Sequence, residues 1–96
     1  MKNEFKPDVD VLMRLAEAFF ENNSMKKTHV YFASRISWIS FERYLNWLIT
    51  KNYVEPVLDG TEGEYRLTNE GREMFFILKK FKDYIKSHKS SSVLYH

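Results

Sequence analysis

The second half of this 96-residue chain constrains the fold most, because its local patterns follow one another without a gap. A helical stretch ends near Asn52, a β-prone segment covers 53–58, and an Asp-Gly pair typical of hairpin turns comes next. A second β-prone segment at 64–68 leads into a long helical pattern from Asn69 to His88. The sequence therefore predicts helix, strand, turn, strand and long helix, in that order.

Two helices are predicted before this region. Asp8 is suited to cap the first, whose apolar residues recur at helical spacing from Val9 to Phe20. Thr28 is expected to cap a short second helix that runs to about Arg35.

The third helix is predicted over 38–51, with Ser37 as its N-cap and Asn52 as a left-handed residue at its end. Helical projection gathers its apolar side chains on one face, with Tyr44 at the margin: Trp38, Phe41, Leu45, Leu48 and Ile49. The opposite face is predicted to hold Ser40, Arg43 and Trp47, flanked by Ile39, Asn46 and Thr50.

A helix followed by a two-stranded hairpin is the arrangement of winged helix-turn-helix modules, whose recognition helix usually enters the major groove of DNA. We therefore expect an α+β fold, with three helices and a two-stranded wing at 1–68. A long C-terminal helix at 69–88 is expected to pack on the same domain, and 89–96 to form a flexible tail. Pro56 places the first wing strand at a sheet edge.

Signals for enzymatic chemistry are poor. The chain has no Cys, only three Gly, and three His that are far apart, so no thiolate, phosphate-loop or metal-ligand pattern arises. We expect no catalytic residues, no metal and no cofactor, and the sequence indicates no small-molecule ligand. No apolar run is long enough for a membrane span and no signal peptide is present, which favours a cytoplasmic protein.

Charge is unevenly distributed along the chain. Residues 23–54 carry a net charge of +4, whereas the predicted wing at 55–68 carries −3. A local cationic face favours a polyanionic partner, and double-stranded DNA is the expected one. The residues predicted to contact it are Lys26, Lys27, Thr28, His29, Ser37, Ser40, Arg43, Asn46, Trp47 and Arg66.

Each of these positions also has a purely structural interpretation. Ser37 merely caps its helix, Arg43 pairs with a nearby acid, and Trp47 packs under the first helix or against a partner. An acidic wing repels phosphates, so DNA contacts are expected mainly from the second and third helices. The alternative function is a winged helix that binds another protein through the acidic wing and exposed aromatics.

The last helix carries an apolar stripe with alternating steps of three and four, as in a coiled-coil seam. Its members are Met74, Ile77, Leu78, Phe81, Tyr84, Ile85 and His88. The part up to Leu78 is expected to close the core against the first helix. The part beyond it predicts a homodimer, because exposed Phe and Ile there are a liability unless a second copy covers them.

Three stretches carry a family resemblance: Lys27-Thr28-His29-Val30 with Ala33 and Ile36-Ser37-Trp38, then Tyr44-Leu45-Asn46-Trp47-Leu48, then Tyr65-Arg66-Leu67-Thr68-Asn69-Glu70-Gly71-Arg72. The chain resembles the archaeal winged-helix group of small ten-kilodalton chromatin-associated DNA-binding proteins and related transcriptional regulators. The resemblance implies double-stranded DNA binding, association with the nucleoid, and antiparallel coiled-coil pairing of the terminal helices into a dimer. The acidic wing departs from the group's pattern.

Overall fold

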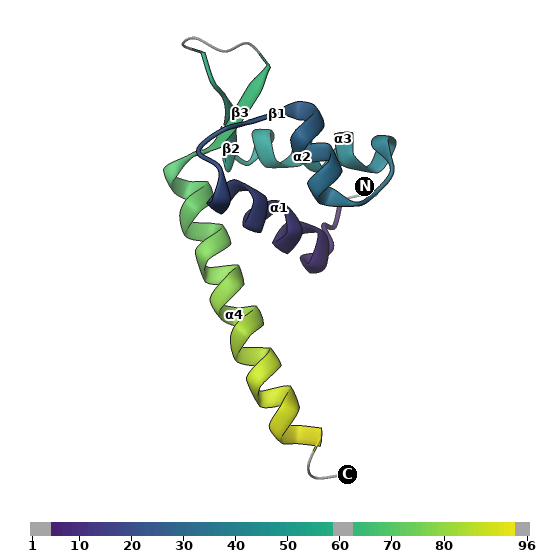
Figure 1. The fold of residues 1–96 in the computed structure, drawn as a ribbon, viewed down its shortest axis with the longest axis vertical. Helices are drawn as coiled ribbons and strands as arrows, with labels where there is room; N and C mark the ends of the chain where they lie inside the picture. The colour runs from purple at the N-terminus through teal and green to yellow at the C-terminus, as the bar shows by residue number, and fades with distance from the viewer. Residues whose placement is uncertain (1–4, 59–62, 94–96) are drawn as a thin grey trace.

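The computed structural model describes residues 5–58 and 63–93. Its elements are α1 (Val9–Glu21), β1 (Met25–Lys26), α2 (Lys27–Ser34), α3 (Trp38–Thr50), β2 (Val54–Pro56), β3 (Glu64–Leu67) and α4 (Asn69–Val93). The first three helices and the sheet form a head, and α4 projects away from it on the side opposite the hairpin (Figure 1). This order confirms the predicted winged helix-turn-helix architecture.

Three of the predicted helix boundaries have the expected local chemistry. The Asp8 carboxylate accepts hydrogen bonds from the backbone N–H groups of Asp10 and Val11, and Ser37 accepts one from Ser40. Asn52 is left-handed, with φ of 65°, as predicted for the end of α3.

The start of α2 differs from the prediction. The helix begins at Lys27 and its N-cap is Lys26, which makes no side-chain capping bond, so the prediction that Thr28 caps it is wrong. The helix ends at Ser34, and its C-cap residue Arg35 is also left-handed, with φ of 58°. Both ends therefore lack the residues that sequence rules look for at helix boundaries.

The sheet is antiparallel and has three strands in the order β1-β3-β2, rather than the predicted two. Strand β1 has only two residues, too few for an alternating apolar pattern to reveal it. Pro56 lies in β2, at the sheet edge, as predicted. The predicted Asp59-Gly60 turn lies outside the described residues.

The core lies between α1, α3 and the sheet and is closed by the first turns of α4. Its largest fully buried side chains include Phe41, Met13, Leu15 and Met25, joined by Phe75 from α4. Within the described part of the chain, no helix combines the length and apolarity needed to cross a membrane.

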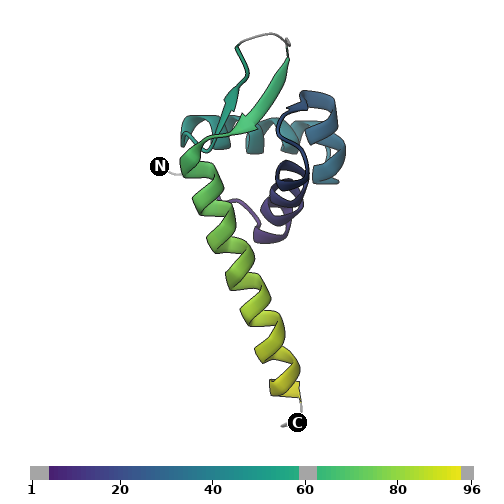
Figure 2. The same ribbon diagram turned by 60° about the vertical axis from the view of Figure 1, so that its left-hand side comes forward.

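Helix α4 has 25 residues and is therefore about 38 Å long. The radius of gyration is 15.1 Å, larger than the roughly 12.5 Å of a compact domain of this length. Figure 2 shows that more than half of the helix extends beyond the head. The helix continues to Val93, whereas we expected a flexible tail from residue 89; residues 94–96 lie outside the described part.

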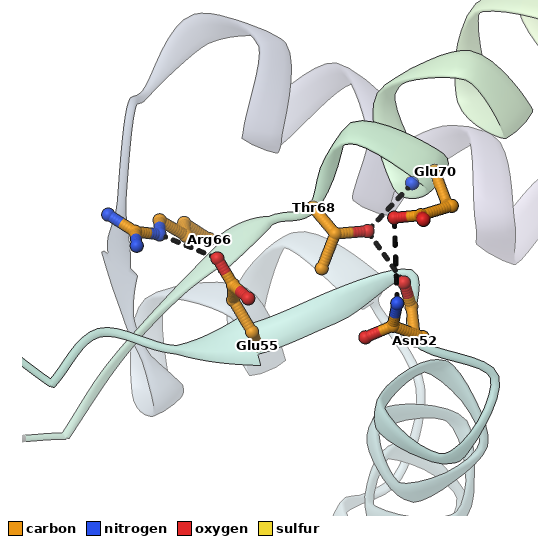
Figure 3. Close-up of polar contacts among 6 residues, drawn as sticks. Asn52, Glu55, Arg66, Thr68 and Glu70 are labelled. Carbon is orange, nitrogen blue, oxygen red and sulfur yellow. Dashed lines mark hydrogen bonds and ion pairs between the residues drawn. The ribbon is translucent and has the colours of Figure 1, made fainter.

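A polar junction joins the end of α3, the base of the wing and the start of α4. The Thr68 hydroxyl donates to the Asn52 carbonyl oxygen at 2.6 Å and accepts from the Gly71 N–H at 2.9 Å (Figure 3). The Thr68 N–H donates to the Tyr53 carbonyl oxygen at 3.1 Å. Gly71 is required at this junction because a Cβ there would lie 1.9 Å from the Tyr53 carbonyl oxygen.

We expect Gly71→Ala to lower the free energy of unfolding by about 2–4 kcal/mol, because the backbone of Tyr53 cannot move without opening the junction. Chemical denaturation followed by circular dichroism measures this loss. Gly63→Ala is the matched control: open space surrounds its Cβ position, and only its φ of 78° opposes the change. The control should lose about 1 kcal/mol, and an equal loss in both variants would contradict the proposed clash.

Candidate nucleic-acid interface

The outer face of α3 is formed by side chains one helical turn apart, Ile39, Arg43, Asn46 and Thr50, all of them exposed. The buried face holds Phe41, Tyr44, Leu45 and Leu48. Arg43 therefore lies on the outer face as predicted. Ile39, Asn46 and Thr50, expected to flank that face, lie on it too. Ser40 and Trp47, expected on the face, are half-buried at its margin.

Arg43 and Asn46 are the two side chains on this face that can make bidentate hydrogen bonds to base edges. Arg43 is exposed, and among residues 5–58 and 63–93 no ion pair engages its guanidinium group. Arg makes a bidentate contact with guanine and Asn with adenine in the major groove. The face is thus chemically equipped to contact DNA bases.

Four predicted phosphate contacts cluster at the start of α2. Lys26, Thr28 and His29 are exposed. The Lys27 ammonium is instead engaged within the domain: Nζ lies 3.2 Å from Glu42 Oε2 and 5.2 Å from the centre of the Trp38 ring. Lys27 must exchange these contacts before it can bind a phosphate, so Lys26 is the more available cation.

Trp47 does not project from the outer face. Its ring packs against Phe5, with centroids 6.1 Å apart, and against Tyr53 at 5.8 Å. Phe5 also meets Tyr44 edge-on at 4.9 Å. The geometry favours the packing alternative for Trp47 over the groove-approaching role, with the segment before α1 as the covering element. Ser37 likewise uses its hydroxyl to cap α3.

The wing neutralises part of its own charge. Arg66 Nε lies 2.9 Å from the carboxylate of Glu55, its cross-strand neighbour, and this pair stands beside the Thr68 junction in Figure 3. The Glu64 carboxylate accepts a hydrogen bond from the Ser24 hydroxyl at 2.5 Å. Arg66 is therefore paired rather than presented to a ligand, and the acidic tip residues Asp59 and Glu62 lie outside the described part of the chain.

The predicted stripe on α4 divides into two parts. Met74 and Leu78 are half-buried against the core, and the anchor between them is Phe75, which is fully buried and which the predicted stripe omits. The second part is exposed and comprises Ile77 (65%), Phe81 (58%), Tyr84 (58%) and Ile85 (44%). The side chain of His88 is outside the described region.

Phe75 could have been found from the sequence by a wider helical projection. Met74, Phe75 and Leu78 share one side of α4, whereas a strict coiled-coil seam skips position 75. A single coiled-coil spacing therefore does not describe α4, because the helix has two apolar sides. One side packs on the core of its own domain, and the other is exposed.

A groove separates the start of α1 from the distal part of α4. It is lined by Val9, Asp10, Phe81, Lys82, Ile85 and Lys86. Val9 is 46% exposed there, so the apolar surface of α4 continues onto α1.

Comparison with known proteins agrees with this architecture. A family model described as winged helix-turn-helix matches residues 9–86, which is most of the chain. No curated protein matches the chain in sequence.

Two of the solved structures that share the fold illustrate the likeness. One is Sso10a-2, a DNA-binding protein from Sulfolobus solfataricus, with a TM-score of 0.74 and 13% identity over 91% of this chain and 90% of that one. The other is a MarR family transcriptional regulator from Silicibacter pomeroyi DSS-3, with a TM-score of 0.69 and 21% identity over 88% of this chain. This chain spans 61% of the latter, and at such identities the likeness is one of fold.

We expect Phe5→Ala to lower the free energy of unfolding by about 1–2 kcal/mol, because it removes an edge-on aromatic pair and uncovers part of the core. In a Trp38→Phe background, where Trp47 is the single indole, the fluorescence emission should shift to the red as Trp47 becomes hydrated. Phe32→Ala, at a side chain that is 72% exposed, serves as the control and should change neither quantity. An unchanged emission in Phe5→Ala would contradict the packing assigned to Trp47.

Proposed function

Because this chain belongs to the winged helix-turn-helix family, we propose that it binds double-stranded DNA as a transcriptional regulator or a chromatin-associated protein. The observation that carries the proposal is the outer face of α3, where Arg43 and Asn46 are exposed side by side on the helix that precedes the wing. One similar structure is described as a DNA-binding protein and another as a transcriptional regulator. The function is one of binding rather than catalysis, and it places the protein at the nucleoid in the cytoplasm.

The role proposed for each residue follows from the exposure of its side chain and from its contacts within the domain. Arg43 and Asn46 contact base edges, and Lys26, Thr28 and His29 hold phosphates next to the groove. Ser40 lies half-buried beside this face and contributes at its margin. Lys27 and Arg66 contribute only if the phosphate replaces Glu42 and Glu55 as their partners.

The alternative, a module that binds another protein, is less well supported. It relied on the acidic wing together with an exposed Trp47 as an aromatic anchor. Trp47 is packed against Phe5 and Tyr53, and two of the wing's acids, Glu55 and Glu64, already have partners within the domain. Arg43 and Asn46, which are exposed on α3, are suited to base edges.

We further propose that the protein is a homodimer held by α4 as an antiparallel coiled coil. The exposed stripe of Ile77, Phe81, Tyr84 and Ile85 follows coiled-coil spacing and runs along the part of α4 that extends beyond the head. The groove against Val9 continues this apolar surface onto α1. Two copies would also double the number of cations available to DNA, which one domain supplies sparsely.

A labelled random duplex, titrated at two salt concentrations and followed by fluorescence anisotropy, tests DNA binding. We expect tight binding at low salt and a log–log slope of about −4 or steeper, because several phosphates are neutralised. Arg43→Ala should reduce this slope by about one for each subunit if the guanidinium group contacts phosphate. If Arg43 reads a base, the variant should instead lose about 1–3 kcal/mol at a preferred site.

Lys80→Ala is the control, because it removes the same charge from α4 rather than from α3. It should leave the salt slope and the affinity for a preferred site close to those of the unsubstituted protein. Unchanged binding of Arg43→Ala on random and on preferred duplexes would contradict the assigned role of α3. Absence of duplex binding even at low salt would overturn the proposed function and shift support to the protein-binding alternative.

The dimer is tested by sedimentation equilibrium. The unsubstituted chain should sediment at about twice its mass of 11.6 kDa, because α4 pairing buries the stripe. Phe81→Glu should sediment as a folded monomer, since it places a charge in the seam at a position already exposed in the single chain. Phe76→Glu, which lies about 140° around α4 from Phe81 and has the Lys80 ammonium 5.4 Å from the centre of its ring, should stay dimeric. A dimeric Phe81→Glu would contradict α4 pairing.

A further inference from the structure

Ile39 is an unexplained side chain on the outer face of α3. It is 77% exposed, the highest exposure among the large apolar residues of this helix. A single exposed aliphatic residue is unremarkable on most surfaces. This one stands one turn before Arg43 and in line with Asn46 and Thr50, so it occupies the N-terminal end of the face that points away from the core.

The backbone that carries Ile39 is fixed. Ser37 caps the helix through its hydroxyl, and its carbonyl oxygen accepts from the Phe41 N–H at 2.8 Å. The neighbouring Trp38 ring packs on Tyr31, with centroids 4.9 Å apart. Because Ile is β-branched, its own first side-chain torsion in a helix is also restricted. The exposed methyl groups of Ile39 therefore have a nearly fixed position.

We propose that Ile39 is a specificity-determining residue that contacts the C5-methyl group of a thymine in the major groove. Thymine is the one base whose major-groove edge carries a methyl group, and an aliphatic side chain is its natural partner. The N-terminal residues of a recognition helix are the ones that meet base edges. The inference rests on the proposed DNA-binding function and adds to it what α3 reads.

The spacing along α3 makes the inference more specific. Ile39 and Arg43 are four positions apart, a rise of about 6 Å along the helix, and consecutive base pairs are about 3.4 Å apart. The thymine contacted by Ile39 therefore lies within about two base pairs of the base contacted by Arg43. Phe32, also exposed at 72%, is on α2 rather than on this face, which makes it a matched apolar control.

The test begins by selecting a preferred duplex from a random pool with the full chain. Each thymine of that duplex is then replaced, one at a time, by deoxyuridine, which lacks only the methyl group. At one position in each half-site, the unsubstituted protein should bind the deoxyuridine duplex about fourfold more weakly, as expected for one buried methyl group. Ile39→Ala should bind the thymine and deoxyuridine duplexes equally at that position.

Two variants make the result diagnostic. Ile39→Val keeps branched methyl groups and should retain the sensitivity to deoxyuridine, and Phe32→Ala should retain it in full. Ile39→Ala should also show the circular dichroism spectrum and the thermal melting temperature of the unsubstituted protein, because it removes no charge and no core contact. These measurements show that the variant is folded.

The proposal is overturned if Ile39→Ala still binds the deoxyuridine duplex more weakly than the thymine duplex. It is also overturned if the unsubstituted protein binds the two duplexes equally. Selection that returns no preferred sequence while salt-dependent binding of random duplexes persists also overturns it, but leaves the proposed DNA-binding function in place. Failure to bind any duplex at low salt is a different result, because it removes the proposed function itself.

Discussion

The contact between Gly71 and the Tyr53 carbonyl group is the constraint on which the rest of the fold depends. Tyr53 begins the wing, and Gly71 lies in the first turn of α4, so their close approach fixes the angle between these two elements. The Thr68 hydroxyl reinforces this approach by bonding both the Asn52 carbonyl oxygen and the Gly71 N–H. A buried hydroxyl with donor and acceptor both satisfied adds no desolvation penalty to the junction. These few backbone groups fix the end of α3, the wing and α4 relative to one another, beside the apolar contacts that Leu48, Leu67 and Phe75 make in the core.

Fewer cations of the proposed DNA face are free of partners in the folded domain than the sequence suggests. The segment 23–54 has a net charge of +4, but Lys27 is held by Glu42 and by the face of Trp38. Arg66, the single cation of the wing segment, is held by Glu55. Exposed ion pairs of this kind contribute little to stability, and a phosphate can compete for either cation. Binding by one domain would then rest on Lys26, Arg43 and the polar groups around them. A second copy is the simplest way for such a domain to neutralise enough phosphates for tight binding.

Local chemistry made much of this structure predictable from the sequence. Asp8, Ser37 and Asn52 each act within a few residues of their own position or at a helix end, and their roles were predicted correctly. Apart from the cap of α2, the omission of Phe75 and the extent of α4, the errors concern contacts between distant segments. Strand β1 exists because Met25 and Lys26 pair with Tyr65 and Glu64, some forty residues later in the chain. The packing of Trp47 depends on Phe5, and the loss of Lys27 as a free cation depends on Glu42. No periodicity in the sequence reports such pairings, because they follow from the tertiary fold. The exposure of Arg43 and Asn46 was predictable, because residues that do not lie on the apolar face of a helix usually face solvent.

Helix α4 connects the stability of one domain to the geometry of the proposed dimer. Its first turns are part of the core, where Phe75 is fully buried, and its distal turns carry Phe81 and Ile85 on the surface. One rigid helix thus belongs to both the domain and the interface, and the junction at Gly71 sets its direction relative to α3. In a symmetric dimer, the two α3 faces would stand at a separation determined by that direction and by the register of the paired stripes. Recognition helices separated by one helical turn of DNA, about 34 Å, can enter successive major grooves. A change of angle at the Gly71 junction would therefore alter half-site spacing without touching any residue that contacts DNA.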